Sequence, residues 1–316
     1  MSLEGRRPVQ MLPVLSALAC LAMTAAPPAA AQTASHAAAA VTLRQAVVDD
    51  PGHAPIPVTI WAPAAGTRLP LVLISHGTGA GPLSHRDTAE ALAEAGFVVV
   101  APMHPGDNVQ DQSAVGGPAW FADRSRQVRR VIDYMLAGWD GHARLAPGRI
   151  GIFGFSAGAT TALIAIGGVP DLGRIAPHCA ATPEFVCRIL APQAGGEAPR
   201  WTHDPRIAAA VVAAPGLGFA FEPAGLANVR APVQLWAGMA DETVPFATNG
   251  AIVRRLLPTA PDVHLVDNAV HLSFLAPCTP ATPPFLCQDN PGFDRAAFHA
   301  SFNAAVVRFF RAQLAR

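Results

Sequence analysis

Short, almost purely apolar runs recur along the chain at intervals that suit the strands of a central sheet. They span residues 71–74, 97–100, 149–153, 208–212, 233–236 and 263–266. Strands that are apolar throughout, without alternating polar residues, are typical of a parallel sheet covered on both faces. Segments 41–48 and 57–61 predict two further strands, because a turn signal at Asp50-Pro51-Gly52 separates them.

Amphipathic stretches lie between these runs and predict helices. Residues 87–95 precede Gly96, residues 159–166 follow a glycine-rich turn, and residues 247–257 end before Pro258. Two longer helices carry an apolar stripe at helical spacing, formed by Val128, Val131, Ile132, Met135 and Leu136 in one and by Phe298, Phe302, Val306 and Phe309 in the other. Alternating strands and helices predict an α/β fold, a doubly wound and mostly parallel sheet with right-handed crossovers and helices on both faces.

Two stretches, residues 167–205 and 275–291, interrupt this alternation. Loops of such length in a compact domain are usually functional, so we expect both to wall a substrate pocket. Each contains one pair of cysteines, and we expect the bridges Cys179–Cys187 and Cys278–Cys287. Other connectivities, free thiols and a zinc site are the alternatives; neither pair has the close spacing of a zinc knuckle.

The N-terminus has the three parts of a secretory signal. Arg6 and Arg7 precede an apolar stretch, residues 11–23, and small residues lead to Ala31. This pattern predicts a signal peptide over 1–31 and one α/β domain over 32–316. An even number of cysteines beyond it suits an oxidising compartment, so we expect a periplasmic or extracellular protein. We expect no membrane span, because the apolar stretch is too short for one. The formal net charge is zero, which disfavours nucleic acid as a partner.

The pentapeptide Gly154-Phe155-Ser156-Ala157-Gly158 matches the pattern G-x-S-x-G. It follows the apolar run 149–153 and opens the predicted helix 159–166. A sharp strand-to-helix turn presents the serine oxygen at the edge of the sheet, and the flanking glycines make room for that turn. We therefore predict that Ser156 is a nucleophile; a glycine-rich turn with an idle serine is the alternative.

A second glycine-rich loop, Ser75-His76-Gly77-Thr78-Gly79, follows the run 71–74. Acyl transfer needs two N–H donors that face the developing oxyanion. We expect them to be the backbone amides of Thr78 and of Ala157, the residue after the nucleophile. His76 stands at a strand end, where we expect it to brace the loop rather than to react.

A serine nucleophile needs a base, and the base needs an acid that orients it. Asp241 follows the run 233–236 and His271 follows the run 263–266, so both should lie at the carboxyl edge of the sheet with Ser156. Glu242 is the alternative acid, and His264, inside a predicted strand, is expected to be structural. His104 and Asp107 occupy another loop at this edge, as pocket residues or as parts of a hydrogen-bonded turn.

Taken in order, the phrases around Ser75–Gly79, Gly154–Gly158, Gly238–Pro245 and His271–Phe274 resemble those of the predicted dienelactone hydrolase group. This group is similar to the plasma platelet-activating-factor acetylhydrolases and, more distantly, to bacterial polyester hydrolases. The resemblance extends over about residues 41–314 and implies an α/β-hydrolase fold with Ser156, Asp241 and His271 as catalytic residues. Dienelactone hydrolases proper carry a cysteine nucleophile, so lactone specificity does not transfer to this chain.

The expected function is therefore the hydrolysis of carboxylic esters (EC 3.1.1.-) through an acyl-enzyme. The expected substrate is a small-molecule or polymeric ester, and the chemistry requires neither a metal nor an organic cofactor. A serine peptidase or amidase with the same three residues is an alternative, because fold and triad do not determine the leaving group. A binding module without catalysis is disfavoured, because Ser156, Asp241 and His271 are all present in order.

Overall fold

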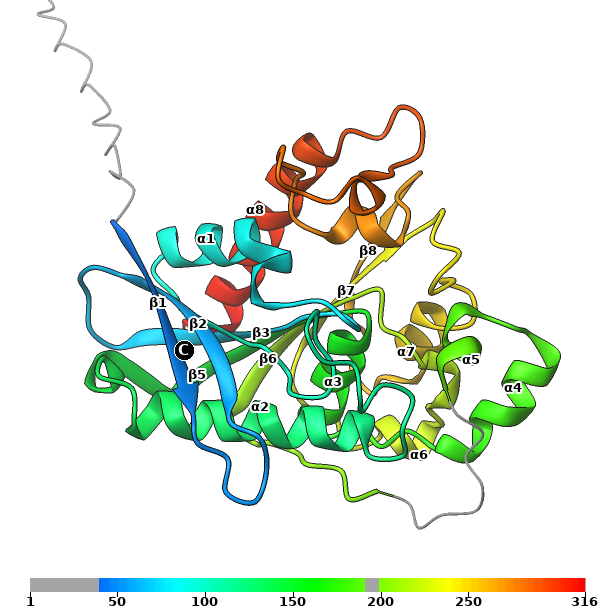
Figure 1. Ribbon diagram of the computed structural model, residues 1–316, viewed down its shortest axis with the longest axis horizontal. Helices are drawn as coiled ribbons and strands as arrows, with labels where there is room; N and C mark the ends of the chain where they lie inside the picture. Colours follow the sequence, from blue (N-terminus) through cyan, green and yellow to red (C-terminus); the bar gives the residue numbers. More distant parts are fainter. Residues whose placement is uncertain (1–39, 191–198, 316) are drawn as a thin grey trace, which may run out of the picture. The chain divides into compact units, whose positions relative to one another are not determined.

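A computed structural model describes residues 40–190 and 199–315; the predicted signal peptide lies outside these ranges. Within them, eight strands form one sheet in the order β1-β2-β4-β3-β5-β6-β7-β8 (Figure 1). The strands are β1 (Val41–Val48), β2 (Ile56–Pro63), β3 (Leu69–Ser75), β4 (Val98–Pro102), β5 (Leu145–Phe155), β6 (Ile207–Ala213), β7 (Val233–Gly238) and β8 (Asp262–Val266). All neighbours from β4 to β8 in this order are parallel, whereas β2 is antiparallel to both β1 and β4. The predicted mostly parallel α/β sheet is confirmed.

Helices cover both faces of this sheet (Figure 1). The α-helices are α1 (Arg86–Glu94), α2 (Trp120–Ala137), α3 (Ala157–Ala165), α4 (Ile175–Ala181), α5 (Phe185–Ile189), α6 (Pro223–Leu226), α7 (Gly250–Leu256) and α8 (Arg295–Leu314). Short 3-10 helices are η1 (Pro82–His85), η2 (His142–Arg144), η3 (Leu172–Arg174), η4 (Gly218–Ala220), η5 (His271–Phe274) and η6 (Pro284–Cys287). Side chains of α1 and α8 pack on one face, and those of α2, α3 and α7 pack on the other. No described helix is both long and apolar enough to cross a membrane.

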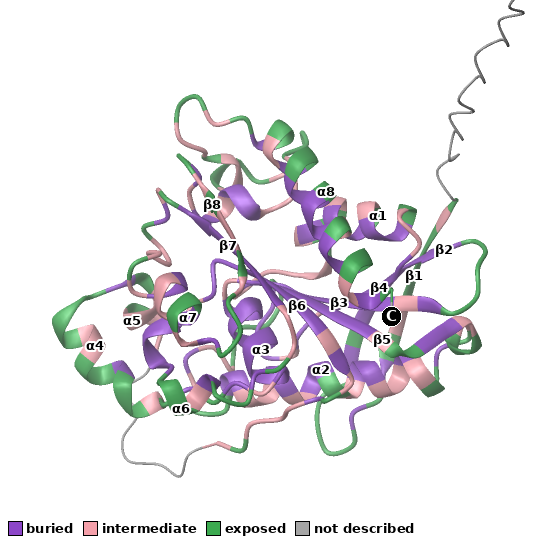
Figure 2. Cartoon of the chain, turned by 180° about the vertical axis from the view of Figure 1, so that it is seen from behind, coloured by how far each residue is buried: buried purple, intermediate pink, exposed green. Residues whose placement is uncertain are grey.

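Alternate residues of the central strands enter opposite halves of the core. In β3, Leu71 and Leu73 pack under α2 and α3, whereas Val72 and Ile74 pack under α1 and α8. Figure 2 shows β3 buried along nearly all of its length. Because both faces are covered, neither needs polar residues, which explains the apolar runs in the sequence. The edge strand β8 differs: its residues are exposed or half-buried, so its apolar run wrongly predicted a buried strand.

The first insertion, 167–205, contains short helices and is not a plain loop. The disulfide Cys179–Cys187 joins α4 to α5, and 191–198 lie outside the described residues. Side chains of this segment pack against Ala157, Leu217 and Phe219, so the insertion covers the start of α3. The second disulfide, Cys278–Cys287, closes the second insertion, as expected.

Candidate active site

Ser156 occupies a tight turn between β5 and α3 that the pentapeptide predicts. Its backbone angles are φ 56° and ψ −120°, which a residue with a side chain adopts only where the surrounding structure imposes them. Its N–H donates to the Ala213 carbonyl of β6 at 2.9 Å. The turn therefore lifts the hydroxyl of Ser156 above the carboxyl edge of the sheet, next to the first turn of α3.

The two glycines of the pentapeptide are required by packing. A Cβ on Gly158 would lie 1.9 Å from the Ser75 carbonyl oxygen, and one on Gly154 would lie 2.1 Å from the carbonyl oxygen of Gly158. Both obstacles are backbone atoms, which cannot move aside without shifting β3 or α3. The glycines thus let α3 approach β3 and β5 closely enough to hold the serine in place.

His271 and Asp241 complete a hydrogen-bonded chain that begins at Ser156. The His271 Nε2 atom lies 3.0 Å from the Ser156 Oγ, and its Nδ1 lies 2.7 Å from the Asp241 Oδ2. The other oxygen of Asp241 accepts bonds from the backbone N–H groups of Thr243 and Val244, at 2.9 and 2.8 Å. Asp241 and His271 are both buried. The Asp241 carboxylate is thus held through one oxygen by His271 and through the other by two backbone amides.

The alternatives from the sequence lie elsewhere. Glu242 is exposed, whereas its neighbour Asp241 faces His271. His264 stacks on the Trp236 ring, with 4.0 Å between ring centroids, and contacts Asp262 on β8. The structure therefore brings together the three residues that the sequence selected and keeps these two apart from them.

The two expected oxyanion donors lie on different elements. Thr78 follows β3, and Ala157 is the first residue of α3. Within the described ranges no acceptor takes a hydrogen bond from the N–H of either residue, whereas the amides of Gly79 and Ala80, next in the β3 loop, are bonded to Asp107 and to Gly77. Both expected donors are therefore unpaired within the described residues.

Two buried histidines support the β3 loop. His76 donates from Nδ1 to the Gly77 carbonyl at 2.7 Å and accepts from the His104 N–H at 3.3 Å. His104 contacts the Ser75 hydroxyl at 2.9 Å and the Gln127 side chain at 2.7 Å. His76 thus braces the loop, as expected, and His104 serves the same support rather than lining a pocket.

Arg124 is a fully buried cation beside this loop that the sequence reading missed. Its guanidinium contacts Asp107 Oδ2 at 2.5 Å, Thr161 Oγ1 at 3.0 Å and Ser75 Oγ at 3.2 Å, and it also bonds the His76 carbonyl. Asp107 in turn accepts from the Gly79 N–H at 2.7 Å. The sequence did contain an indication of this buried cation. Position 124 lies four and seven residues before Val128 and Val131, on the buried stripe of the helix, where a charge requires a partner.

Burial lowers the pKa of three histidines around the site. The pKa of His76 falls to about 3 and that of His85 to about 4, chiefly because burial disfavours the charged imidazolium. The pKa of His104 lies well below its usual range for the same reason, with Arg124 adding to the effect. All three rings are therefore neutral at the pH values where esters are usually assayed.

These shifts predict a loss of stability in mild acid. Below the ordinary histidine pKa of about 6.5 the unfolded chain binds protons that the folded chain refuses, so the free energy of unfolding decreases as the pH falls toward 4. Each histidine contributes up to about 1.4 kcal/mol per pH unit in this window. Urea denaturation at a series of pH values measures the slope.

His85 offers a test of one of these contributions, because its ring packs against the rings of Phe153 and Phe155, with 5.0 and 5.2 Å between ring centroids, where a phenyl ring can replace it. We expect His85→Phe to reduce the slope of the free energy of unfolding against pH by the contribution of about one bound proton. A free energy of unfolding that stays constant between pH 6.5 and 5 in the parent protein contradicts this account.

The second cysteine loop is tied to the segment that carries His271. The Ser273 hydroxyl donates to Asp289 at 2.6 Å, and Arg295 holds the same carboxylate from α8. Asp289 lies two residues beyond Cys287. The bridge Cys278–Cys287 thus restrains a loop that reaches η5, where His271 lies.

Removing this bridge is expected to lower turnover. The double variant Cys278→Ser/Cys287→Ser should lose about tenfold in kcat, because displacements below 1 Å in a reacting group already slow catalysis. The comparison variant is Cys179→Ser/Cys187→Ser, which opens the other bridge, in a loop that packs against α3 and η4. Equal kcat in the parent and the first variant, with loss of the bridge verified by mass, refutes the coupling.

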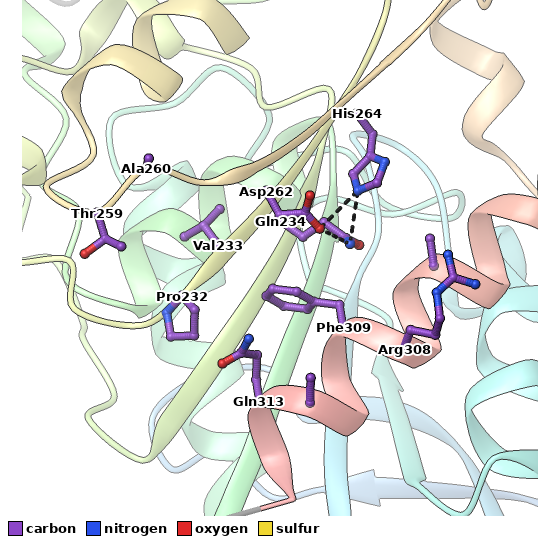
Figure 3. A pocket seen from close by; sticks show the side chains of 12 residues that line it. Pro232, Val233, Gln234, Thr259, Ala260, Asp262, His264, Arg308, Phe309 and Gln313 are labelled. Carbon is purple, nitrogen blue, oxygen red and sulfur yellow. Dashed lines mark hydrogen bonds and ion pairs between the residues drawn. The ribbon is translucent and has the colours of Figure 1, made fainter. Parts of the chain in front are cut away.

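Two of the hollows on the surface of the described residues contain none of Ser156, Asp241 and His271 in their lining. The larger, about 400 Å³, lies between β7, β8 and α8, where Gln234 contacts Asp262 and His264 (Figure 3). It adjoins the beginning of β7, at the opposite end of that strand from the Asp241 loop. Ligands of open α/β sheets bind at the carboxyl ends of the strands, so this hollow has no evident part in the site. No group of three or more His, Cys, Asp or Glu side chains in the described ranges is placed to hold a metal ion.

The chain is similar to known hydrolases. The profile of the Dienelactone hydrolase family matches residues 56–186, a segment that includes Thr78 and Ser156. Among solved structures, a dienelactone hydrolase from Anabaena variabilis has 18% sequence identity and a TM-score of 0.55, over 87% of this chain and 99% of that one. Esterase 2 of Thermogutta terrifontis has 18% identity and a TM-score of 0.57, over 85% and 94%. A cold-adapted esterase from an Arctic intertidal metagenomic library has 18% identity and a TM-score of 0.51, over 87% and 94%. No curated protein matches the chain.

By its sheet order and helix arrangement the chain has the α/β-hydrolase fold. Residues 56–186 match the dienelactone hydrolase family, in agreement with the sequence resemblance, and this match supports a hydrolase.

Proposed function

We propose that this protein is an exported carboxylic ester hydrolase that works through an acyl-enzyme on Ser156. The observation that carries the proposal is the hydrogen-bonded chain from Ser156 to His271 and Asp241, with distances of 3.0 and 2.7 Å. A serine beside a histidine that a buried carboxylate orients is the arrangement that activates a hydroxyl for attack on a carbonyl.

In the acylation step, the Ser156 oxygen attacks the ester carbonyl while His271 Nε2 takes the hydroxyl proton. The carbonyl π bond opens to a tetrahedral oxyanion, which accepts hydrogen bonds from the N–H groups of Thr78 and Ala157. When the oxyanion collapses, the bond to the alcohol oxygen breaks and His271 returns its proton to that oxygen. Asp241 stabilises the imidazolium that exists between these two proton transfers.

Deacylation repeats the sequence with water. His271 removes a proton from the water molecule as it attacks the acyl carbonyl, and the same two amides stabilise the second oxyanion. Collapse releases the carboxylic acid and returns the proton to Ser156. These steps require no metal or organic cofactor.

The two bridged insertions support export and a walled pocket. Disulfides persist in oxidising compartments, which agrees with a periplasmic or extracellular location. The first insertion packs on the start of α3, and the second is tied to the His271 segment through Ser273. We propose that they flank the acyl and alcohol parts of a small-molecule or polymeric ester.

The proposal is tested by hydrolysis of p-nitrophenyl esters from acetate to laurate, beside the matched p-nitroanilides. We expect turnover of at least one ester with a pre-steady-state burst, and much slower turnover of the anilide with the same acyl group. The acyl-length profile then gives the size of the acyl pocket. Faster turnover of the anilide supports a peptidase or amidase, and no turnover of any substrate by folded, bridged protein contradicts the proposal.

A further inference from the structure

The two proposed oxyanion donors belong to different elements. Thr78 lies in the loop after β3, whereas Ala157 begins α3 after β5. A bound oxyanion needs both N–H groups at hydrogen-bonding distance at once, so the separation of these elements must be set to within a fraction of an ångström.

Arg124 on α2 makes contact with both elements. On the β3 side its NH2 group donates to the His76 carbonyl and to the Ser75 hydroxyl. On the α3 side its Nε donates to the Thr161 hydroxyl, which donates in turn to the Ala157 carbonyl at 2.8 Å. One planar guanidinium therefore connects the segments that carry both donors.

Asp107 fixes the other side of the β3 loop and partners the buried cation. It accepts from the Gly79 N–H through Oδ1, and from the Trp120 indole at 2.6 Å and Arg124 through Oδ2. This ion pair thus holds His76, which lies two residues before Thr78, and Gly79, which follows Thr78. Arg124 and Asp107 are each 1% exposed, so water does not substitute for either partner.

We propose that Arg124 is a positioning residue that sets the distance and orientation of the Thr78 and Ala157 N–H groups for the oxyanion. The inference rests on the proposed function and adds to it the residue that assembles the oxyanion site. The fixed fork of a guanidinium is needed, because an ammonium group on a flexible chain cannot hold several acceptors in one plane.

The experiment compares the parent with Arg124→Lys, which retains the positive charge opposite Asp107. Active-site titration first gives the concentration of reactive enzyme, so that rates are expressed per competent molecule. We expect kcat for a p-nitrophenyl ester to fall about 10²-fold with little change in KM. The Ki of a trifluoromethyl ketone, which forms a tetrahedral oxyanion on the serine, should rise by a similar factor.

The ketone separates positioning from a merely structural role. A structural role lowers the melting temperature and the titrated fraction but leaves kcat and the ketone Ki per competent molecule unchanged, and that result overturns the proposal. Thr161→Val keeps the ion pair between Arg124 and Asp107 and removes only the connection to Ala157. We expect this variant to lower kcat about tenfold and to raise the ketone Ki about tenfold. It decides the question if Arg124→Lys does not fold.

Arg126→Lys is the matched control, because Arg126 is on the same helix and pairs with Asp50 outside the site. We expect its kcat and ketone Ki to equal those of the parent. Ser156→Ala runs in the same series. An inactive Ser156→Ala together with normal Arg124→Lys and Thr161→Val rejects this inference alone, whereas an active Ser156→Ala rejects the proposed function.

Discussion

Replacing Ser156 by alanine is expected to lower kcat for ester hydrolysis by on the order of 10⁶-fold, leaving only the small acceleration that an oxyanion site provides without a nucleophile. The reason is geometric: no other hydroxyl is placed 3.0 Å from His271 Nε2 among the described residues. The measurement is the initial rate with the best p-nitrophenyl ester, on variant protein purified apart from the parent.

Two further variants show whether the loss comes from chemistry or from folding. Ser301→Ala removes an exposed hydroxyl from α8 and should leave both kcat and stability unchanged. Ser156→Gly should be as inactive as the alanine variant yet more stable than the parent by about 1 kcal/mol, because glycine adopts a φ of 56° without strain. Activity within about tenfold of the parent in Ser156→Ala excludes Ser156 as the nucleophile.

Asp241→Asn is expected to lower kcat by about 10⁴-fold while the protein remains folded. The backbone N–H groups of Thr243 and Val244 both need an acceptor at the Oδ1 position, so the amide oxygen of the new side chain must occupy it. The amide NH₂ then faces His271 Nδ1 and donates to it. His271 is thereby held with its proton on Nε2, the tautomer that cannot accept the proton of Ser156.

The matched control for this variant is Glu242→Gln, which changes the same charge at an exposed neighbour. We expect a kcat within about twofold of the parent for Glu242→Gln, and a melting temperature near that of the parent for both variants. Steady-state kinetics at pH values around neutrality measure the effect. A large loss in Glu242→Gln with little loss in Asp241→Asn would show that the acid was assigned to the wrong residue.

The fold was accessible to sequence reasoning because its signals are local. Strands covered on both faces must be apolar throughout, and helices between them must carry one apolar stripe. The edge strand β8 misled this reasoning, since an apolar run does not reveal whether both of its faces are covered. Helices α4 and α5 also went unseen, because seven and five residues are too few to show a helical period, and tertiary packing with a disulfide stabilises them instead.

The sequence predicted those residues of the candidate site that come directly after a strand. Ser156, Asp241 and His271 each come after an apolar run, so the topology alone gathers them at one edge. Arg124 and Thr161 lie inside helices, and the hydrogen bonds that link them to the β3 loop and to Ala157 depend on how α2 and α3 pack against the sheet. Only the position of Arg124 on a buried stripe pointed to its role, and its partners could not be chosen without coordinates.

The most direct measurement is to trap the acyl-enzyme. The protein is mixed with a p-nitrophenyl ester, quenched in acid during the burst, digested and mapped by mass spectrometry. We predict an acyl group on the peptide that contains Ser156, in an amount equal to the burst, and none on that peptide in Ser156→Ala. Turnover with no acylated peptide, or with the acyl group on another residue, would contradict the account.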